Sequence, residues 1–169
     1  SFTESDGDEV QLSLSGGGSG WFTVAGGQLT GLILEGTNSS SKVEVKVTGG
    51  TGDGLVQLNN VAINTFDDAS LSSFILDGDL DGSDSLNIDG DVKDRLSFNS
   101  VNTSGTISVG GNTGRITTNS VSAGTFNLNT IGTFETTNGN FTGTLTSLGL
   151  GRFSVRGDVL DGVIYGRDY

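Results

Sequence analysis

Alternation of apolar and polar residues runs along most of the chain and predicts β-strands. Residues 10–14 alternate strictly, and residues 43–47 repeat the same period of two. Glycine-rich stretches at 15–20 and 49–54 interrupt the alternation, as turns between strands do. Apart from one short polar segment after residue 65, no stretch shows the period of an amphipathic helix. We therefore expect an all-β protein.

A longer repeat is superimposed on the alternation from residue 55 onward. Residues 95–111 and 115–128 share an opening arginine, the triplet Asn-Ser-Val and a Gly-Thr pair, and residues 133–151 overlay 152–166 in a similar way. Successive segments begin about 18 to 22 residues apart, which is the range of a coil in a repeat protein. Such agreement at a nearly constant step indicates stacked structural units.

Stacking the repeated segments places apolar residues in three columns. The first column holds Phe74, Leu96, Ile116, Phe134 and Phe153; the second holds Leu80, Val101, Val121, Phe141 and Leu160; the third holds Leu86, Ile107, Phe126, Leu145 and Ile164. This pattern predicts a single-stranded parallel β-helix, or β-solenoid, with right-handed winding, about eight coils of about 18–23 residues and three short strands per coil. A β-sandwich or barrel of short strands is the competing interpretation, although neither requires repeats in the same phase.

The length of 169 residues suits one domain with a single core. Within one solenoid domain spanning 1–169, we expect a polar lead-in at 1–9, irregular N-terminal coils at 10–54 and regular repeats at 55–169. The chain has no proline, in agreement with a wall in which nearly every backbone N–H is needed by a neighbouring coil.

Charge and composition exclude several classes of function. With 20 acidic and 8 basic residues the net charge is −12, which repels phosphate backbones and anionic membrane surfaces, so we expect no nucleic-acid partner. No apolar run approaches the length of a membrane span, so we expect no membrane insertion. Histidine and cysteine are absent, which excludes Ser-His-Asp and Cys-His catalysis and the usual zinc sites.

One acidic segment resembles the start of a calcium loop. Asp77, Asp79 and Asp81 are spaced like its first three ligands and a glycine follows, but Ile88 stands where the bidentate glutamate belongs. We consider Ca²⁺ a candidate cofactor, with Asp77, Asp79, Asp81 and Asp84 as its ligands. The alternative interpretation is that Gly-Asp pairs simply form the corners of the coils.

A second acidic group suggests a catalytic alternative. Asp89, Asp91, Asp94 and Arg95 could supply the paired acids and basic residue that pectin-degrading β-helices use. Acids on a solvated face are far more common, so we expect a protein that is not an enzyme.

The chain resembles the glycine- and threonine-rich β-solenoid repeats of very large secreted bacterial surface proteins. The resemblance lies in residues 6–24, in residues 29–54 and in the iterated form of residues 153–162. It implies an adhesin-like or matrix protein, located outside the cell or at its surface, with no catalytic residues to carry over.

Two functions remain open from the sequence. The first is a non-enzymatic structural or adhesive scaffold, part of a longer surface protein or self-associating through the solenoid ends into a filament, with glycans or other surface proteins as further partners. The alternative is a carbohydrate-binding or polysaccharide-degrading β-helix, with calcium held by the acidic turns from Asp77 to Asp94.

Overall fold

The alternating segments form β-strands in the computed structural model, which describes residues 1–65, 69–160 and 163–166. One 14-stranded sheet winds into a parallel β-solenoid of about four turns, and the described residues contain no helix. The predicted all-β class and solenoid architecture are therefore confirmed. The strands are β1 (Phe2–Thr3), β2 (Glu9–Ser15), β3 (Ser19–Ala25), β4 (Gln28–Glu35), β5 (Lys42–Gly49), β6 (Leu58–Thr65), β7 (Leu71–Leu76), β8 (Leu80–Gly82), β9 (Ser85–Ile88), β10 (Val92–Ser97), β11 (Ser100–Thr118), β12 (Ser120–Thr136), β13 (Thr144–Val155) and β14 (Val163–Gly166).

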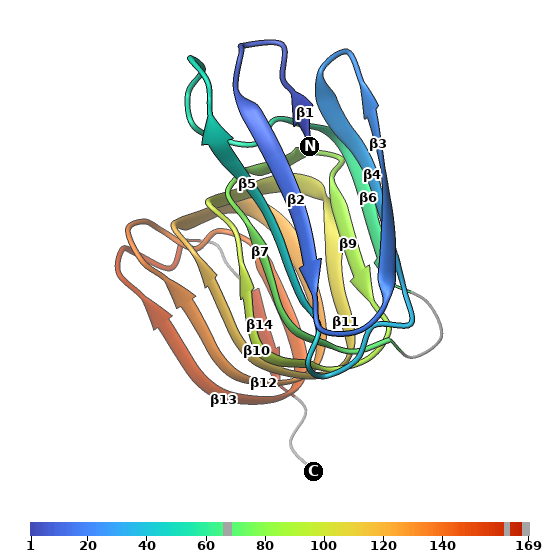
Figure 1. The fold of residues 1–169 in the computed structure, drawn as a ribbon. Coiled ribbons are helices and arrows are strands. Elements are labelled where there is room, and N and C mark those ends of the chain that lie inside the picture. The colour runs from blue at the N-terminus through green and yellow to red at the C-terminus, as the bar shows by residue number, and fades with distance from the viewer. Residues whose placement is uncertain (66–68, 161–162, 167–169) are drawn as a thin grey trace.

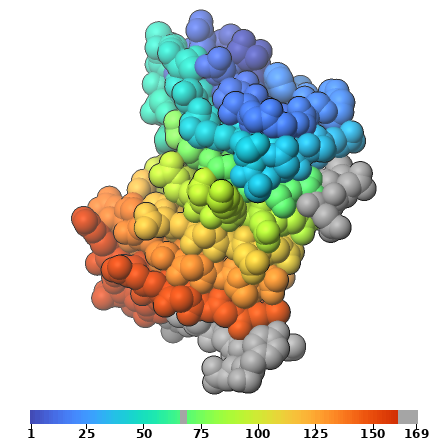
Figure 2. Space-filling model, turned by 60° about the horizontal axis from the view of Figure 1, so that its bottom comes forward, coloured from blue at the N-terminus to red at the C-terminus, as the bar shows by residue number. Residues whose placement is uncertain are grey.

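Each turn of the solenoid pairs with the turns before and after it. The single strand β11 runs alongside three strands of the preceding turn, since β8, β9 and β10 all pair with it in parallel. β12 pairs with β11, β13 with β12, and β14 with β13, again in parallel. Successive parts of the chain consequently form successive layers, which appear as colour bands in Figure 2 and as nested ribbons in Figure 1.

Two of the predicted apolar columns form the interior as expected. Register pairs link the first column in the order Phe74, Leu96, Ile116, Phe134 and Phe153, and the third in the order Leu86, Ile107, Phe126, Leu145 and Ile164. The first four members of each column are completely buried. Burying a side chain of this size contributes about 1.5–3 kcal/mol, so the columns are a principal source of stability.

The second column is correct except for its last member. Pairs and bridges link Leu80, Val101, Val121 and Phe141 as predicted, but Phe141 then bridges to Val159 instead of Leu160. The last corner is one residue shorter than the repeat implies. Because side chains alternate between the faces of a strand, this shift of one residue changes which side chain continues the column.

Phenylalanines fill the interior of the C-terminal coils. The ring centroid of Phe134 lies 5.1 Å from that of Phe126 and 5.3 Å from that of Phe141, both in edge-to-face arrangements. It also stacks on Phe153 at 5.5 Å. Aromatic pairs of this geometry add about 0.5–1.5 kcal/mol to the effect of burial, which makes Phe134 the centre of the cluster.

Antiparallel strand pairs replace the coils expected in the N-terminal part. β2 pairs antiparallel with β5, and β3 pairs antiparallel with β4. Parallel stacking begins only where β5 meets β7 and β4 meets β6. In Figure 1 the blue and teal strands β2, β3, β4 and β5 extend two walls of the solenoid at one end. Antiparallel strands are not turns of a coil, so the structure has about four turns and not the eight expected. The right-handed winding stays a prediction.

Glycines occupy one corner where successive coils touch backbone to backbone. A Cβ atom added to Gly132 would lie 2.6 Å from the carbonyl oxygen of Gly114. One added to Gly151 would lie 2.6 Å from the carbonyl oxygen of Gly132. Any side chain at these positions must push two coils apart, so the glycines set the close spacing of the turns.

Candidate functional site

The most buried acid of the predicted calcium loop is a structural acceptor. Asp84, between β8 and β9, has no exposed surface. Its carboxylate accepts the backbone N–H groups of Val61 at 2.7 Å and Asp81 at 3.0 Å. Burial raises the pKa of Asp84 above its ordinary value; the two N–H groups lower it in part, and the charge of Asp81 raises it further. Asp84 therefore closes a corner between neighbouring coils.

The other three predicted calcium ligands do not gather around Asp84. Asp79 accepts the side-chain amide of Asn99 at 2.7 Å and the backbone N–H of Ser100 at 2.9 Å. Asp77 and Asp81 are exposed at the surface. No three of the four carboxylates bring ligand oxygens within 4.8 Å of one another. Calcium binding at this corner stays a prediction, with no cluster of ligands to support it.

The role of Asp84 predicts a pH-dependent effect on stability. In Asp84→Asn, the amide NH₂ must face one of the two buried N–H groups, so we expect a loss of about 1–3 kcal/mol at about pH 5. An acid with a raised pKa in the folded state stabilises the fold at low pH and loses that contribution as the pH rises. The difference between wild type and Asp84→Asn should consequently shrink towards about pH 8, as measured by urea unfolding at both pH values.

Asp91→Asn is the matched control for this prediction. Asp91 is exposed, and its carboxylate accepts the backbone N–H of Asn112 at 2.6 Å. Water can replace that bond, so the control should change the free energy of unfolding by less than about 1 kcal/mol. If the difference in free energy of unfolding between wild type and Asp84→Asn stays constant or grows with pH, the raised pKa of Asp84 is contradicted.

Of the acids considered for catalysis, Asp89 and Asp91 lie at the corner between β9 and β10, and Asp94 lies within β10. Asp94 accepts a hydrogen bond from the hydroxyl of Ser72 in the preceding coil. Asp91 accepts a hydrogen bond from the backbone N–H of Asn112 in the following coil, and Asp89 accepts one from the side-chain amide of Asn87. Asp91 and Asp94 thus connect neighbouring coils, whereas Asp89 makes a local contact. The positions of Asp89 and Asp91 agree with the interpretation that these acids form corners of the coils. The polysaccharide-degrading alternative stays a prediction.

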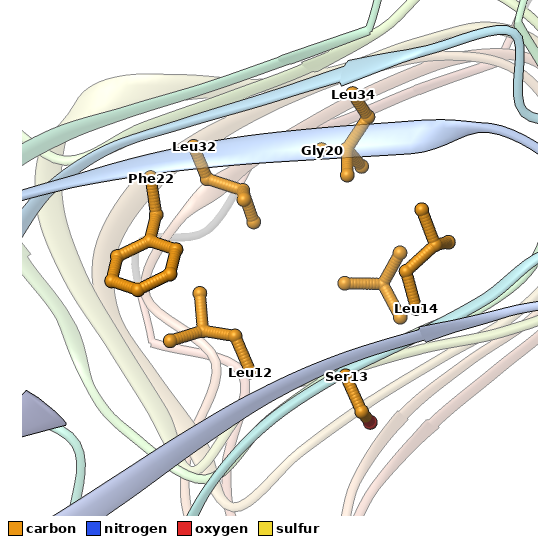
Figure 3. A pocket seen from close by; sticks show the side chains of 8 residues that line it. Leu12, Ser13, Leu14, Gly20, Phe22, Leu32 and Leu34 are labelled. Carbon is orange, nitrogen blue, oxygen red and sulfur yellow. The ribbon is translucent and has the colours of Figure 1, made fainter. Parts of the chain in front are cut away.

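An apolar cleft opens between β2 and the β3–β4 hairpin at the N-terminal end. Figure 3 shows Leu12 facing Phe22 and Leu32 across this cleft and Leu14 facing Leu34, whereas Ser13 points away from it. The cleft has a volume of about 180 Å³, and none of the described residues that line it is charged. Its chemistry suits apolar side chains better than an ion or a sugar.

Exposed large apolar side chains are confined to the two ends of the solenoid. At the N-terminal end the exposed fractions are 55% for Trp21, 39% for Phe22, 37% for Val24 and 41% for Ile33; at the C-terminal end they are 48% for Val159 and 46% for Leu160. Among the side chains that the structure describes, those between residues 34 and 158 include no other of this kind. The coils between the first and last layers therefore expose polar walls. In the first layer Phe22 faces the cleft, whereas Trp21 and Ile33 pair across β3 and β4 on the opposite, outer face.

The predicted polar lead-in contains an acidic cluster that the sequence pattern did not reveal. Glu4, Asp6 and Asp8 each offer a carboxylate oxygen, and these oxygens lie within 4.8 Å of one another. Glu4 is 4% exposed and Asp8 is 2% exposed. Burial raises the pKa of Glu4 to about 7; the N–H of Gln57 opposes the shift, and three nearby aspartates add to it.

Sequence gives one signal for this cluster, an acid at every second position from 4 to 8, which places three carboxylates in one short turn. Its burial depends on residues 52–57, which are distant in the chain. Asp8 accepts the N–H groups of Gly52 at 2.6 Å and Gly54 at 2.7 Å, and Glu4 accepts that of Gln57 at 2.6 Å. No local pattern could predict these contacts.

In its described part, the chain has no helix long and apolar enough to cross a membrane.

Comparisons with known proteins identify no relative of this chain. The solenoid part of the resemblance to bacterial surface proteins is confirmed by the fold, whereas the adhesin-like family stays a prediction. No protein-family model, no curated protein and no solved structure matches this chain.

Proposed function

We propose that this protein is a non-enzymatic extracellular scaffold whose copies associate end to end. The observation that carries the proposal is the confinement of exposed large apolar side chains to the first and last layers of the solenoid, with polar walls on the coils between them. Apolar patches rimmed by polar surface mark interaction sites. Such a rod offers apolar contacts at its first and last layers, whereas the coils between them offer no comparable apolar surface among the described side chains.

The N-terminal cleft continues the interior of the solenoid. Leu14 pairs with Val43, which pairs with Phe74 of the first column. Phe22 pairs with Leu32, which pairs with Ile63 above the third column. Apolar side chains of a second copy that enter the cleft would thus be stacked on the existing core. Val159 and Leu160, exposed at the opposite end, have the chemistry to do so.

Two strand edges flank the cleft. Among the described residues, β3 pairs only with β4, and β2 pairs with β5 and with the two-residue β1. Most of the outer edges of β2 and β3 therefore offer free backbone donors and acceptors, which another chain can pair with. Because the N-terminal end of one copy meets the C-terminal end of another, the contact does not close on itself and extends into a filament.

Sedimentation velocity tests this association. The wild-type protein should show a sedimentation coefficient that rises with concentration, and more steeply at high salt, because salt screens the repulsion between copies of net charge −12. We expect either Phe22→Glu or Val159→Glu alone to abolish the concentration dependence, because each places a charge in the apolar contact. Electron micrographs of the wild type should show filaments.

Asn127→Glu is the control for the added charge. Asn127 is exposed on the wall at β12, far in sequence from both apolar ends. This variant should associate like the wild type. A wild-type protein that stays monomeric at high concentration and high salt, or association that survives both end variants, would overturn the proposal.

A further inference from the structure

The acidic cluster at the N-terminal end holds a buried oxygen with no partner. Glu4 Oε1 accepts the N–H of Gln57 at 2.6 Å, but Glu4 Oε2 is buried and has no hydrogen-bond partner. Buried carboxylate oxygens are normally paired, since an unpaired one loses its hydration without replacement. Glu4 is also the residue that offers a carboxylate oxygen within 4.8 Å of those of Asp6 and Asp8. The arrangement is incomplete without a donor or a cation.

Among the described residues, no basic side chain forms an ion pair with the cluster. Asp6, Asp8 and Asp53 all act on Glu4 as like charges. In the described part of the chain, the only ion pairs join Lys42 and Lys46 to Glu44 on β5. Carboxylates that share a site repel each other unless a proton or a metal ion lies between them.

The cluster retains acceptor capacity beyond its own hydrogen bonds. Each oxygen of Asp8 accepts one N–H group, from Gly52 or Gly54, and a carboxylate has about four acceptor positions in total. Asp6 Oδ1 accepts the N–H of Asp8 at 3.2 Å, and its Oδ2 accepts that of Asp53 at 3.4 Å. These bonds fix the orientation of the carboxylates and leave lone pairs free for an ion.

The loop at residues 49–54 closes tightly over the cluster. A Cβ atom at Gly52 would lie 2.5 Å from the carboxyl carbons of Asp6 and Asp8, so a side chain there would displace the carboxylates. Gly50 has a φ of 121°, and a Cβ atom added there would lie 2.5 Å from Cα of Asp8. The chain thus brings backbone to the acids at positions where only glycine fits.

We propose that Glu4, Asp6 and Asp8 form a Ca²⁺ site that ties the turn between β1 and β2 to the loop after β5. The donor set consists of carboxylate oxygens, which suit hard cations, and the chain has no histidine or cysteine for softer metals. Ca²⁺ takes about 6–8 oxygens in flexible geometry, whereas Mg²⁺ usually uses one or two carboxylates and keeps its water. A group of three carboxylates, of which Glu4 and Asp8 are buried and Asp6 is partly exposed, therefore favours Ca²⁺.

Calcium binding can be measured by isothermal titration with CaCl₂ and by thermal unfolding in CaCl₂ or in EDTA. Wild-type protein should bind one Ca²⁺, and its Tm should rise by about 3–8 °C in about 10 mM CaCl₂, with a smaller rise in MgCl₂. Glu4→Gln and Asp6→Asn should each weaken binding by about tenfold or more and remove most of the Tm rise. Both variants should remain folded in EDTA, because each keeps the shape of the side chain.

Asp81→Asn is the control, because Asp81 is exposed and belongs to the calcium loop predicted from the sequence. It should keep the full calcium response. A wild type that shows neither heat of binding nor a Tm rise overturns the proposal. So does a response that Asp81→Asn removes and Glu4→Gln and Asp6→Asn retain. An equal Tm rise in MgCl₂ overturns the assignment of the ion to calcium.

Discussion

Replacement of Phe134 by alanine is expected to lower the free energy of unfolding by about 3–5 kcal/mol. Phe134 is completely buried and contacts three other phenylalanine rings from neighbouring parts of the coils. The loss combines the transfer of the ring to water with the cavity left inside a narrow tube, whose walls are fixed by hydrogen bonds between coils and cannot collapse easily. Urea unfolding followed by circular dichroism measures the change.

Phe22→Ala is the matched control for this substitution. Phe22 is 39% exposed and lines the cleft, so the same deletion should lower the free energy of unfolding by no more than about 1.5 kcal/mol. Phe134→Leu should recover part of the loss, because leucine fills part of the cavity. Equal losses for Phe134→Ala and Phe22→Ala would show that Phe134 does not lie in a closed interior.

Gly132→Ala should lower the free energy of unfolding by about 3 kcal/mol through a different cause. The added methyl group would meet the backbone carbonyl of Gly114 in the adjacent coil, and a backbone atom cannot turn aside as a flexible side chain can. The coils must separate locally, which weakens their hydrogen bonds. Thermal unfolding should show a Tm lower by several degrees.

Gly149→Ala tests whether the effect is specific to the corner. A Cβ atom at Gly149 would lie 3.5 Å from Cγ2 of Thr130, an ordinary contact with a side chain. Its effect should stay within about 1 kcal/mol. A Gly132→Ala variant as stable as Gly149→Ala would mean that the coils are not held at the spacing observed.

The solenoid could be predicted because its core repeats along the sequence. Phe74, Leu96 and Ile116 occupy the same place in successive segments, and the pairs that the structure forms between them follow that order. Val159 replaced Leu160 in the second column because the repeat fixes the phase of a strand only where the preceding corner keeps its length.

Pairing direction could not be predicted at the N-terminal end. An alternating segment such as residues 10–14 has the same period of two in a parallel and in an antiparallel sheet. The orientation depends on which segment comes to lie beside it. β2 lies antiparallel to β5, from which the whole β3–β4 hairpin separates it in the chain. Counting alternating segments therefore gave more coils than the structure contains.

The acidic residues illustrate the same limit at the level of sites. Asp77, Asp79 and Asp81 have the spacing of a calcium loop, but their environment separates them into corner and surface positions. Glu4, Asp6 and Asp8 have the same spacing without the glycine that follows, and the burial of Glu4 and Asp8 comes from a loop that is distant in sequence. Spacing describes the residues that a site contains, whereas the contacts made by the fold decide whether they meet.

The parallel stacking of β11 on β12 has a genetic consequence. Residues 95–111 and 115–128 have closely similar sequences, and each coil offers its neighbour an almost equivalent surface. Unequal recombination between the corresponding stretches of the gene would add or delete a whole coil without creating a mismatched interface. The length of such a rod can therefore evolve in discrete steps while its cross-section stays constant.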